Sequence, residues 1–393
     1  MADSDFVVDG NKVVEFKLVK IGDDLLDNSL IFRPQMCHQI FGDEESIYGF
    51  KNLRIKLYYK ADSLQLYCGF DYEAKLPGIE VSDLMRKIKS KYEFDIIENL
   101  QDFEILVSTE KVYPSGLLIS EFQGCEKKQY EIYHCTNSTP NFINFHQRLQ
   151  TFLVWFIDAA SYVDMDDSGW NFFVLFEKYH SGEEIRYSVV GYASVYDYYA
   201  YPEHIRPRIS QVLILPPYQS KGLCMKLLFS VYNHYLAEKS NILDFTVEDP
   251  SEEFQRVRDC VDCKRVLEKD IINPQKLATE TRMKLIEDMH IICKINKKQA
   301  RRVYEILKLK YINRQNEQEF TNYRVEVKRR LNQPYQKQMK LISKCKSGMT
   351  LQEVHDNLIS DEDRKARLDM MFLETIDQYS SVIARLHTNG STV

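Results

Sequence analysis

The segment that most restricts the fold of this chain is residues 211–225, where an apolar run ends at two prolines and a short loop leads into a helical pattern. The apolar run predicts a buried strand, and Pro216 and Pro217 remove two backbone donors, so they end its pairing with a neighbouring strand. The first turn of the helix that follows leaves backbone N–H groups unpaired at the positive end of the helix dipole. Because Gly222 lets the backbone approach a ligand closely, we expect this loop to hold a phosphate or pyrophosphate.

The surrounding segments place this loop in an α/β core. Apolar and aromatic runs predict strands at residues 172–176, 187–199, 209–215 and 242–247. Helical spacing predicts helices at residues 143–162 and 222–236. Strands that alternate with helices in this way are typical of an α/β fold.

The chain is expected to contain further domains on both sides of this core, because 393 residues exceed the usual size of one domain. Before the core, residues 53–59 and 64–70 predict a strand pair, and residues 81–92 predict a helix. After residue 265 the pattern becomes helical, with Asn296 as a candidate N-cap. We therefore expect a β-rich, substrate-side domain at 1–110, a core at 111–268, a basic helical domain at 269–346 and a polar helical tail at 347–393.

Composition excludes several classes of protein. The 14 glycines and 11 prolines are too few for long flexible linkers or collagen-like repeats. The longest apolar run, residues 152–157, is far shorter than the roughly 18–20 residues that span a bilayer. The first residues are acidic and lack a signal-peptide pattern, so neither a membrane protein nor a secreted one is expected. Nine irregularly spaced cysteines are typical of free thiols in a reducing compartment.

Charge is unevenly distributed along the chain. Residues 294–346 contain 16 Lys and Arg against 4 Asp and Glu, whereas residues 1–293 are strongly acidic. An acidic body suits a cationic substrate, and the basic segment suits an acidic partner. Both segments are also compatible with ordinary solvated surfaces.

Several common catalytic motifs are missing from the sequence. It contains neither G-x-G-x-x-G nor a P-loop, which disfavours nicotinamide and ATP chemistry, and the absence of G-x-S-x-G and H-E-x-x-H disfavours hydrolases. Cys260-x-x-Cys263 has no second ligand pair at zinc spacing, so we expect no metal.

The loop of residues 211–225 resembles a known signature. Gln219-x-x-Gly222-x-Cys224 follows the Q/R-x-x-G-x-G/A acetyl-CoA signature of the GNAT acetyltransferases. The wider context is more specific: the segments VGYASVYDYYAYPEHIRPRISQVLILPPYQSKG, DFTVEDPSEEFQRVRD and INKKQARRVYEILKL resemble the type B histone acetyltransferase catalytic subunit family. The resemblance extends from about Phe32 to Lys346. It implies a GNAT-type mixed, twisted sheet flanked by helices.

The resemblance also implies an activity and partners. Members of this family transfer acetyl groups from acetyl-CoA to lysines in the tail of new histone H4, with H2A as a further candidate. A WD-repeat histone-binding subunit is the implied partner, and the nucleus and cytoplasm are the implied locations. Direct DNA binding is not expected, because the basic residues at 294–330 are scattered around their helices.

Matching this sequence to the family positions implies two sets of binding residues. Those implied to contact acetyl-CoA are Val212, Leu213, Ile214, Gln219, Ser220, Lys221, Gly222, Leu223, Cys224, Met225 and Glu253. Those implied to hold the histone tail are Asp43, Glu44, Glu45, Trp170, Tyr196, Asp197 and Tyr198. Carboxylates would bind the positive charges of a basic peptide, and aromatic rings would pack against its aliphatic stems. These aromatic residues are also compatible with an ordinary core.

The chemistry of lysine acetylation requires a base, because a lysine amine with a pKa near 10.4 is almost wholly protonated at pH 7. Glu248 and Asp249 at a strand end, together with Asp158, are the candidate catalytic carboxylates, and their clustering would raise the pKa of one of them. This chain departs from the family at two positions. Asp158 replaces a glutamate and has a shorter reach, and Cys224 replaces Gly or Ala at the close approach to the cofactor.

Three alternatives remain open from sequence. Cys224 at a helix N-terminus could form an acetyl-cysteine intermediate, but no histidine at motif spacing would serve as its base, so direct attack in a ternary complex is favoured. A degenerate acetyltransferase could bind histone or acetyl-CoA without turnover. The basic helix at 296–309 could bind nucleic acid.

Overall fold

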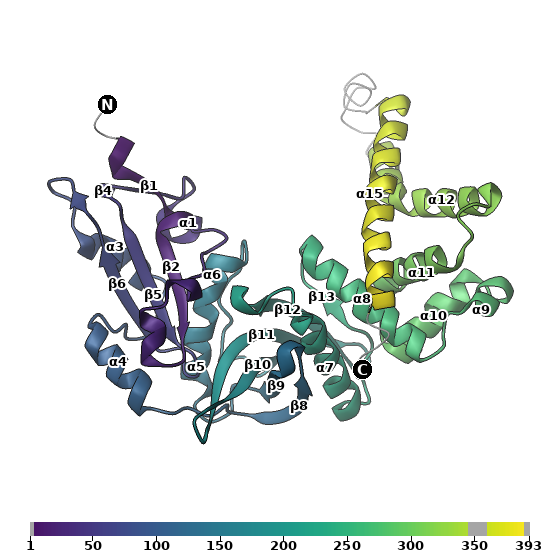
Figure 1. Cartoon of the computed structure of the whole chain (residues 1–393). Helices are drawn as coiled ribbons and strands as arrows, with labels where there is room; N and C mark the ends of the chain where they lie inside the picture. Colours follow the sequence, from purple (N-terminus) through teal and green to yellow (C-terminus); the bar gives the residue numbers. More distant parts are fainter. Residues whose placement is uncertain (1–3, 345–359, 389–393) are drawn as a thin grey trace. The chain divides into compact units, whose positions relative to one another are not determined.

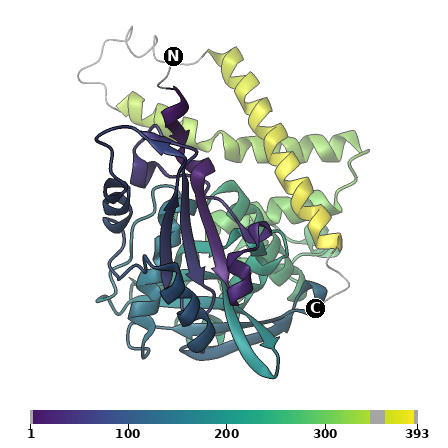
Figure 2. The same cartoon turned by 60° about the vertical axis from the view of Figure 1, so that its left-hand side comes forward.

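The computed structural model describes residues 4–344 and 360–388 and divides into two compact units, Met1–Asp249 and Pro250–Val393 (Figures 1 and 2). The division into four domains expected from sequence stays a prediction. No helix among the described residues is long and apolar enough to cross a membrane.

A six-stranded sheet forms the core of the first unit, in the order β13-β12-β11-β10-β9-β8. Its strands are β8 (Leu117–Gln123), β9 (Gln129–Cys135), β10 (Trp170–Ser181), β11 (Glu184–Ala200), β12 (His204–Ile214) and β13 (Thr246–Val247). All neighbours are antiparallel except β12 and β13, which are parallel. Together with the flanking helices, this mixed sheet confirms the α/β class.

Two helices cover opposite faces of this sheet. On one face, the α7 helix (Leu223–Glu238) packs His234 and Tyr235 against Phe173. On the other, the α5 helix (Phe142–Leu149) packs His146 against Phe172. Adjacent strand residues point to opposite faces of a sheet, so Phe172 faces α5 and Phe173 faces α7.

A second, three-stranded sheet lies at the purple end of the colour scale in Figures 1 and 2. Its order is β2-β5-β6, and the antiparallel pairing of β5 with β6 confirms the predicted strand pair. The elements of this region are β1 (Val7–Asp9), α1 (Gly10–Val13), β2 (Val14–Val19), α2 (His38–Phe41), β3 (Ser46–Tyr48), β4 (Phe50–Lys51), β5 (Arg54–Lys60), β6 (Leu66–Asp71), β7 (Ala74–Lys75), α3 (Val81–Lys89) and α4 (Leu100–Thr109).

Two sequence predictions near the sheet were only partly right. Helical backbone runs through α5, a 3₁₀ turn (Gln150–Phe152) and α6 (Leu153–Phe156), then stops, so residues 157–162 are not helical. The apolar stripe ends at Phe156, which leaves the next turn nothing to bury. The strand predicted at 242–247 is reduced to β13, with an isolated bridge from Ile242 to Ile205.

The second unit is helical, which confirms the helices predicted after residue 265 and adds α8, which was not predicted. Its helices are α8 (Glu252–Glu268), α9 (Pro274–Thr279), α10 (Arg282–Cys293), α11 (Lys297–Tyr311), α12 (Glu317–Leu331), α13 (Gln333–Lys344) and α15 (Asp361–Thr388). The side chain of Asn296 accepts a hydrogen bond from the Gln299 amide, which confirms the predicted N-cap of α11. Residues 347–359 and 389–393 of the predicted tail lie outside the described residues.

A buried polar network joins three helices of this unit. Glu305 on α11 is fully buried and accepts hydrogen bonds from Arg330 on α12 and Tyr379 on α15. Burial raises the pKa of the Glu305 carboxyl, although Arg330 acts in the opposite direction. Its two partners satisfy a carboxylate that would otherwise be costly to bury.

Candidate functional site

The loop between β12 and α7 has the conformation of an anion-binding helix start. Ser220 and Gly222 both have positive φ, 61° and 76°, and Gly222 is the N-cap of α7. A Cβ added to Gly222 would meet no atom within 4 Å, so the space beside the N-cap of α7 is open. The Gln219 and Lys221 side chains hold the loop through the carbonyls of Ile214 and Pro217, at 2.8 Å each. The first-turn residues Leu223, Cys224 and Met225 follow directly and present their amides to that space.

The strand that leads into this loop also has an open edge. On one side, Val212, Leu213 and Ile214 pair with β11. On the other side, β13 pairs with β12 only at Arg208 and Ile209, so among the described strands nothing continues that edge. Pairing of β12 with β13 thus ends at Ile209, well before the two prolines, whereas its pairing with β11 continues to Ile214, directly before them.

Cys224, the second residue of α7, lies in an environment that opposes its ionisation. Burial raises the pKa of this thiol to about 12. This burial acts against the thiolate that a helix N-terminus would favour.

Glu253, the remaining residue of the acetyl-CoA set, belongs to the second unit. It lies in the first turn of α8, is 78% exposed, and its carboxylate is 3.0 Å from Arg256.

Glu248 follows β13 and is held beside β12. Its backbone amide bonds to the Ile209 carbonyl at 2.9 Å, and its carboxylate accepts a 2.6 Å hydrogen bond from the Ser210 hydroxyl. Its other carboxylate oxygen lies 3.5 Å from Nη2 of Arg208. Asp249 comes next, with φ +27°. Nothing in the sequence pattern singled out Ser210 or Arg208.

Asp158 has a different neighbour. It lies beyond the end of α6, is 75% exposed, and its carboxylate is 3.4 Å from Nε2 of His38. The side-chain partner of Asp158 is thus His38, whereas those of Glu248 are Ser210 and Arg208, and the single carboxylate cluster expected from sequence stays a prediction.

His38 links Asp158 to the acidic turn at residues 43–45. Its Nδ1 lies 3.6 Å from Glu45, while its Nε2 faces Asp158. A lone histidine with no partner at motif spacing gave no signal in the sequence, because the three residues meet only through the fold.

The three carboxylates of the acidic turn at residues 43–45 differ in exposure and in hydrogen-bond partners. Asp43 and Glu44 are exposed, as a peptide-binding role requires. Glu45 instead accepts hydrogen bonds from the backbone amides of Cys37 (2.6 Å) and His38 (3.0 Å). These bonds, that from Cys37 above all, lower the pKa of Glu45. Glu45 therefore holds its own turn in this structure, and its contact with the histone tail stays a prediction.

An aromatic face lies on the α5 side of the large sheet. Trp170 and Tyr196 are cross-strand partners whose rings meet edge to face at 5.0 Å, and the Tyr196 and Tyr198 rings are 4.6 Å apart. Arg208 lies opposite Tyr196 on β12, with its guanidinium carbon 5.9 Å from the Tyr198 ring centre. Through Arg208 the fold joins these three aromatic residues, predicted to bind the tail, to the predicted base Glu248.

Asp197 does not belong to this face, although it was expected in the same tail-binding set, and its role stays a prediction. Strand alternation points it to the α7 side, where it accepts hydrogen bonds from Tyr235 (2.9 Å), Lys239 and Asn171 (3.3 Å). Its carboxylate ties the sheet to α7 and is not available beside Tyr196 and Tyr198.

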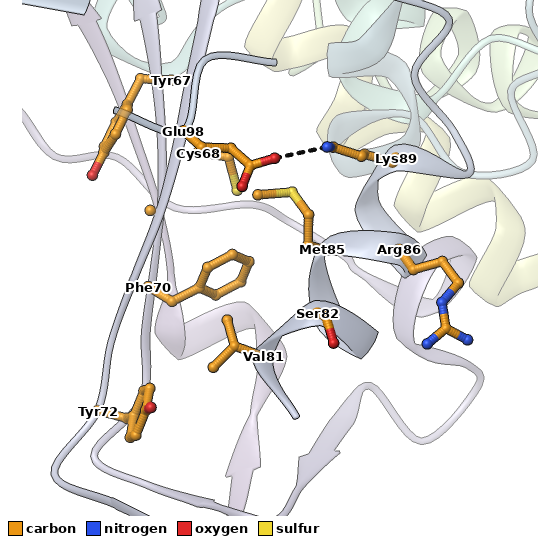
Figure 3. Close-up of a pocket in the computed structure, with 11 residues that line it drawn as sticks. Tyr67, Cys68, Phe70, Tyr72, Val81, Ser82, Met85, Arg86, Lys89 and Glu98 are labelled. Atoms are coloured by element: carbon orange, nitrogen blue, oxygen red, sulfur yellow. Dashed lines mark hydrogen bonds and ion pairs between the residues drawn. The ribbon is translucent and has the colours of Figure 1, made fainter. Parts of the chain in front are cut away.

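A pocket of about 770 Å³ lies elsewhere in the first unit and contains none of the predicted site residues. In Figure 3, Phe70 on β6 and Met85 and Val81 on α3 point into it. The 2.8 Å ion pair of Lys89 with Glu98 lies across one end.

Comparisons with known proteins place these features in context. Residues 6–158 match the family model described as histone acetyl transferase HAT1 N-terminus, and residues 258–309 match that described as histone acetyltransferase type B catalytic subunit, C-terminal. The chain is 35% identical over 388 residues to the histone acetyltransferase type B catalytic subunit of Homo sapiens, covering 96% of this chain and 92% of the relative. Its identity to the Rattus norvegicus protein of that name is 36% over 392 residues, with the same coverage.

Likeness to a solved structure is much weaker. An aminoglycoside acetyltransferase from an uncultured soil metagenomic sample, in complex with sisomicin, matches 39% of this chain and 91% of its own. The identity is 15% and the TM-score 0.23, too slight to bear on function.

Proposed function

Because this chain belongs to the histone acetyltransferase type B catalytic subunit family, we propose that it transfers acetyl groups from acetyl-CoA to lysine ε-amines of the histone H4 tail. The chain is an acetyltransferase by this membership. The observation that supports a lysine substrate most strongly is the carboxylate of Glu248 next to an aromatic face that already holds a cation, Arg208. An ammonium group needs such an arrangement of carboxylate and ring.

Acetyl-CoA would bind along β12 and the loop that follows it. The open edge beside Val212–Ile214 offers backbone groups to an extended ligand arm, and the amides at the start of α7 offer partial positive charge to a pyrophosphate. Backbone amides alone can bind the pyrophosphate, so no cationic side chain is needed. This agrees with Lys221, whose ammonium donates to the Pro217 carbonyl of the same loop.

We assign proton removal to Glu248 and direct attack to the freed amine. The lysine ammonium would first lie against the carboxylate of Glu248, which takes one proton and leaves a neutral amine. The amine attacks the thioester carbonyl, the carbon–nitrogen bond forms and the carbon–sulfur bond breaks. CoA leaves as the thiolate and takes up the second proton of the attacking nitrogen. Ser210 holds the carboxylate oxygen at 2.6 Å and so fixes the direction from which the proton is taken. Asp158, in contact with His38, would act from another side as an electrostatic support.

The proposal is tested by incubating the full chain with acetyl-CoA and an H4 tail peptide and measuring the peptide by mass spectrometry. A gain of one acetyl group on a lysine is the expected result. Calorimetric binding of acetyl-CoA without any acetylated peptide would instead identify a binding module.

Replacing Cys224 by Ala is expected to leave kcat within about two-fold of the unmodified chain. Ala fits the acetyl-CoA signature, and a thiol with a pKa near 12 supplies almost no thiolate at pH 7. Steady-state kinetics with the tail peptide checks this. If Cys224→Ala abolished turnover and an acetylated Cys224 accumulated in the unmodified chain, the acetyl-cysteine route would replace direct attack.

Charge reversal at Asp43 and Glu44 is expected to raise the KM for the tail peptide several-fold while leaving acetyl-CoA affinity unchanged. Both side chains are exposed, and each reversal replaces attraction for a basic peptide by repulsion. Glu45→Ala is the contrasting variant, because loss of the carboxylate that accepts from the Cys37 and His38 amides should lower the melting temperature. A constant KM in the doubly reversed variant would leave the turn as a solvated loop.

The family resemblance also leads us to propose a WD-repeat histone-binding subunit as partner, and locations in both nucleus and cytoplasm. Co-purification of the tagged chain with such a subunit would test the first proposal, and imaging of the tagged chain the second.

A further inference from the structure

Arg208 is the cation closest to Glu248 among the contacts described above. It lies on β12 opposite Tyr196, with its guanidinium over Tyr198 at 5.9 Å and Nη2 at 3.5 Å from the Glu248 carboxylate. The arginine therefore fills the space between a ring and a carboxylate, which is the space assigned above to the substrate ammonium.

Each contact of Arg208 is a loose one. The 3.5 Å separation exceeds the roughly 2.7–2.9 Å of a charge-assisted hydrogen bond, and 5.9 Å is near the outer limit for a cation over a ring. Its Nε is buried and lacks a hydrogen-bond partner among the described residues. Glu248 meanwhile is held by Ser210 at 2.6 Å, so its position does not depend on the arginine.

Arg206, two residues earlier on the same strand, shows what a tightly paired arginine looks like here. Its Nε and Nη2 both bond to Asp244, at 2.6 and 3.3 Å. Paired hydrogen bonds of this kind give geometric specificity as well as energy. Arg208 makes no such pair with Glu248. Its interaction with the carboxylate therefore depends on its positive charge and its position and not on paired hydrogen bonds.

We propose that Arg208 is the resident cation of a subsite formed by Tyr198 and Glu248, and that the ammonium of the substrate lysine displaces it. This inference rests on the proposed role of Glu248. In the free protein Arg208 supplies the positive charge beside the carboxylate. When substrate enters, one cation replaces another, so the net charge of the subsite is unchanged. A neutral side chain cannot make this exchange, and the subsite therefore selects cationic substrates.

The test measures equilibrium binding with two short H4 tail peptides that differ at one position, lysine in one and norleucine in the other, with CoA present to prevent turnover. Arg208→Met keeps an apolar stem over Tyr198 and removes the competing charge. We expect this variant to lower the dissociation constant of the lysine peptide about two- to five-fold, the range of an exposed ion pair. The norleucine peptide should bind as before.

Three further variants isolate the cause. Arg208→Lys keeps a cation and should preserve the ratio of the two affinities seen in the unmodified chain. Arg208→Met combined with Glu248→Gln should not bind the lysine peptide more tightly, because the carboxylate that the arginine would otherwise occupy is absent. Arg206→Gln, which breaks the Asp244 pair, should leave the ratio unchanged. Arg208→Gln, expected to act as Arg208→Met does, provides a second charge-removing variant should the Met protein not fold.

Weaker binding of the lysine peptide by Arg208→Met, or an unchanged ratio between the two peptides, would overturn the resident-cation assignment. The proposed base is tested separately through turnover. If Glu248→Gln acetylates the tail at the full rate, the catalytic role fails even where the binding ratio shifts as expected.

Discussion

Replacing Glu248 by Gln is expected to lower kcat for tail acetylation by about 10²–10⁴-fold, the usual contribution of a positioned general base. The amide keeps the shape of the side chain and still accepts the Ser210 hydrogen bond, but it cannot take a proton at pH 7. Steady-state kinetics with the H4 tail peptide measures the loss, and calorimetry with acetyl-CoA should show unchanged affinity.

The pH dependence of this variant provides a second measurement. Below the pKa of lysine, each unit of pH raises the neutral amine about ten-fold, so the rate of Glu248→Gln should rise with pH more steeply and further than that of the unmodified chain. Glu203→Gln, an exposed glutamate in the turn between β11 and β12, is the matched control and should keep full activity. A kcat within two-fold of normal for Glu248→Gln would remove this residue from the role of base.

Replacing Gly222 by Val is expected to weaken acetyl-CoA binding by at least about ten-fold, equivalent to about 1.4 kcal/mol. A valine Cβ would project into the open space beside the N-cap of α7, where the ligand must approach the backbone amides. The backbone at φ +76° is also one that a β-branched residue adopts only with strain.

A control variant separates the effect of backbone strain on stability from the loss of acetyl-CoA binding. Gly182 in the turn between β10 and β11 has φ +65° and equally open space around a Cβ, so Gly182→Val should lower the melting temperature by a comparable amount. Only Gly222→Val should raise the acetyl-CoA dissociation constant measured by calorimetry. Equal affinities in the two variants would exclude the loop from the cofactor site.

The sequence predicted the elements of the fold better than the neighbours of the site residues. Periodicity located β10, β11, β12 and α7, because buried faces leave regular apolar spacing. Motif spacing identified the loop around Gly222, whose positive φ is a property that glycine itself signals. These features depend on residues close together along the chain.

The residues that contact the carboxylates of Asp158 and Glu248 could not be predicted in the same way. His38 meets Asp158 only because α2 and the end of α6 lie together, and Arg208 meets Glu248 only through the register of β12 with β13. Asp197 is different, because alternation along a strand already assigns it to the face opposite Tyr196 and Tyr198. The sequence therefore already separates Asp197 from its two tyrosine neighbours.

The network around Glu305 has a consequence for the order in which this protein acquires its structure. Tyr379 follows Glu305 by 74 residues, and Phe372, Tyr379 and Val382 bury the inner side of α15. At roughly 5–20 residues per second, a ribosome needs about 4–15 s to make that span. Throughout this interval the nascent α11 helix carries a carboxyl group without one of its two partners, beside an uncovered apolar surface. The acetyltransferase sheet can complete its folding while synthesis continues, but the helical unit must wait for α15 to emerge, and is open to chaperones until then.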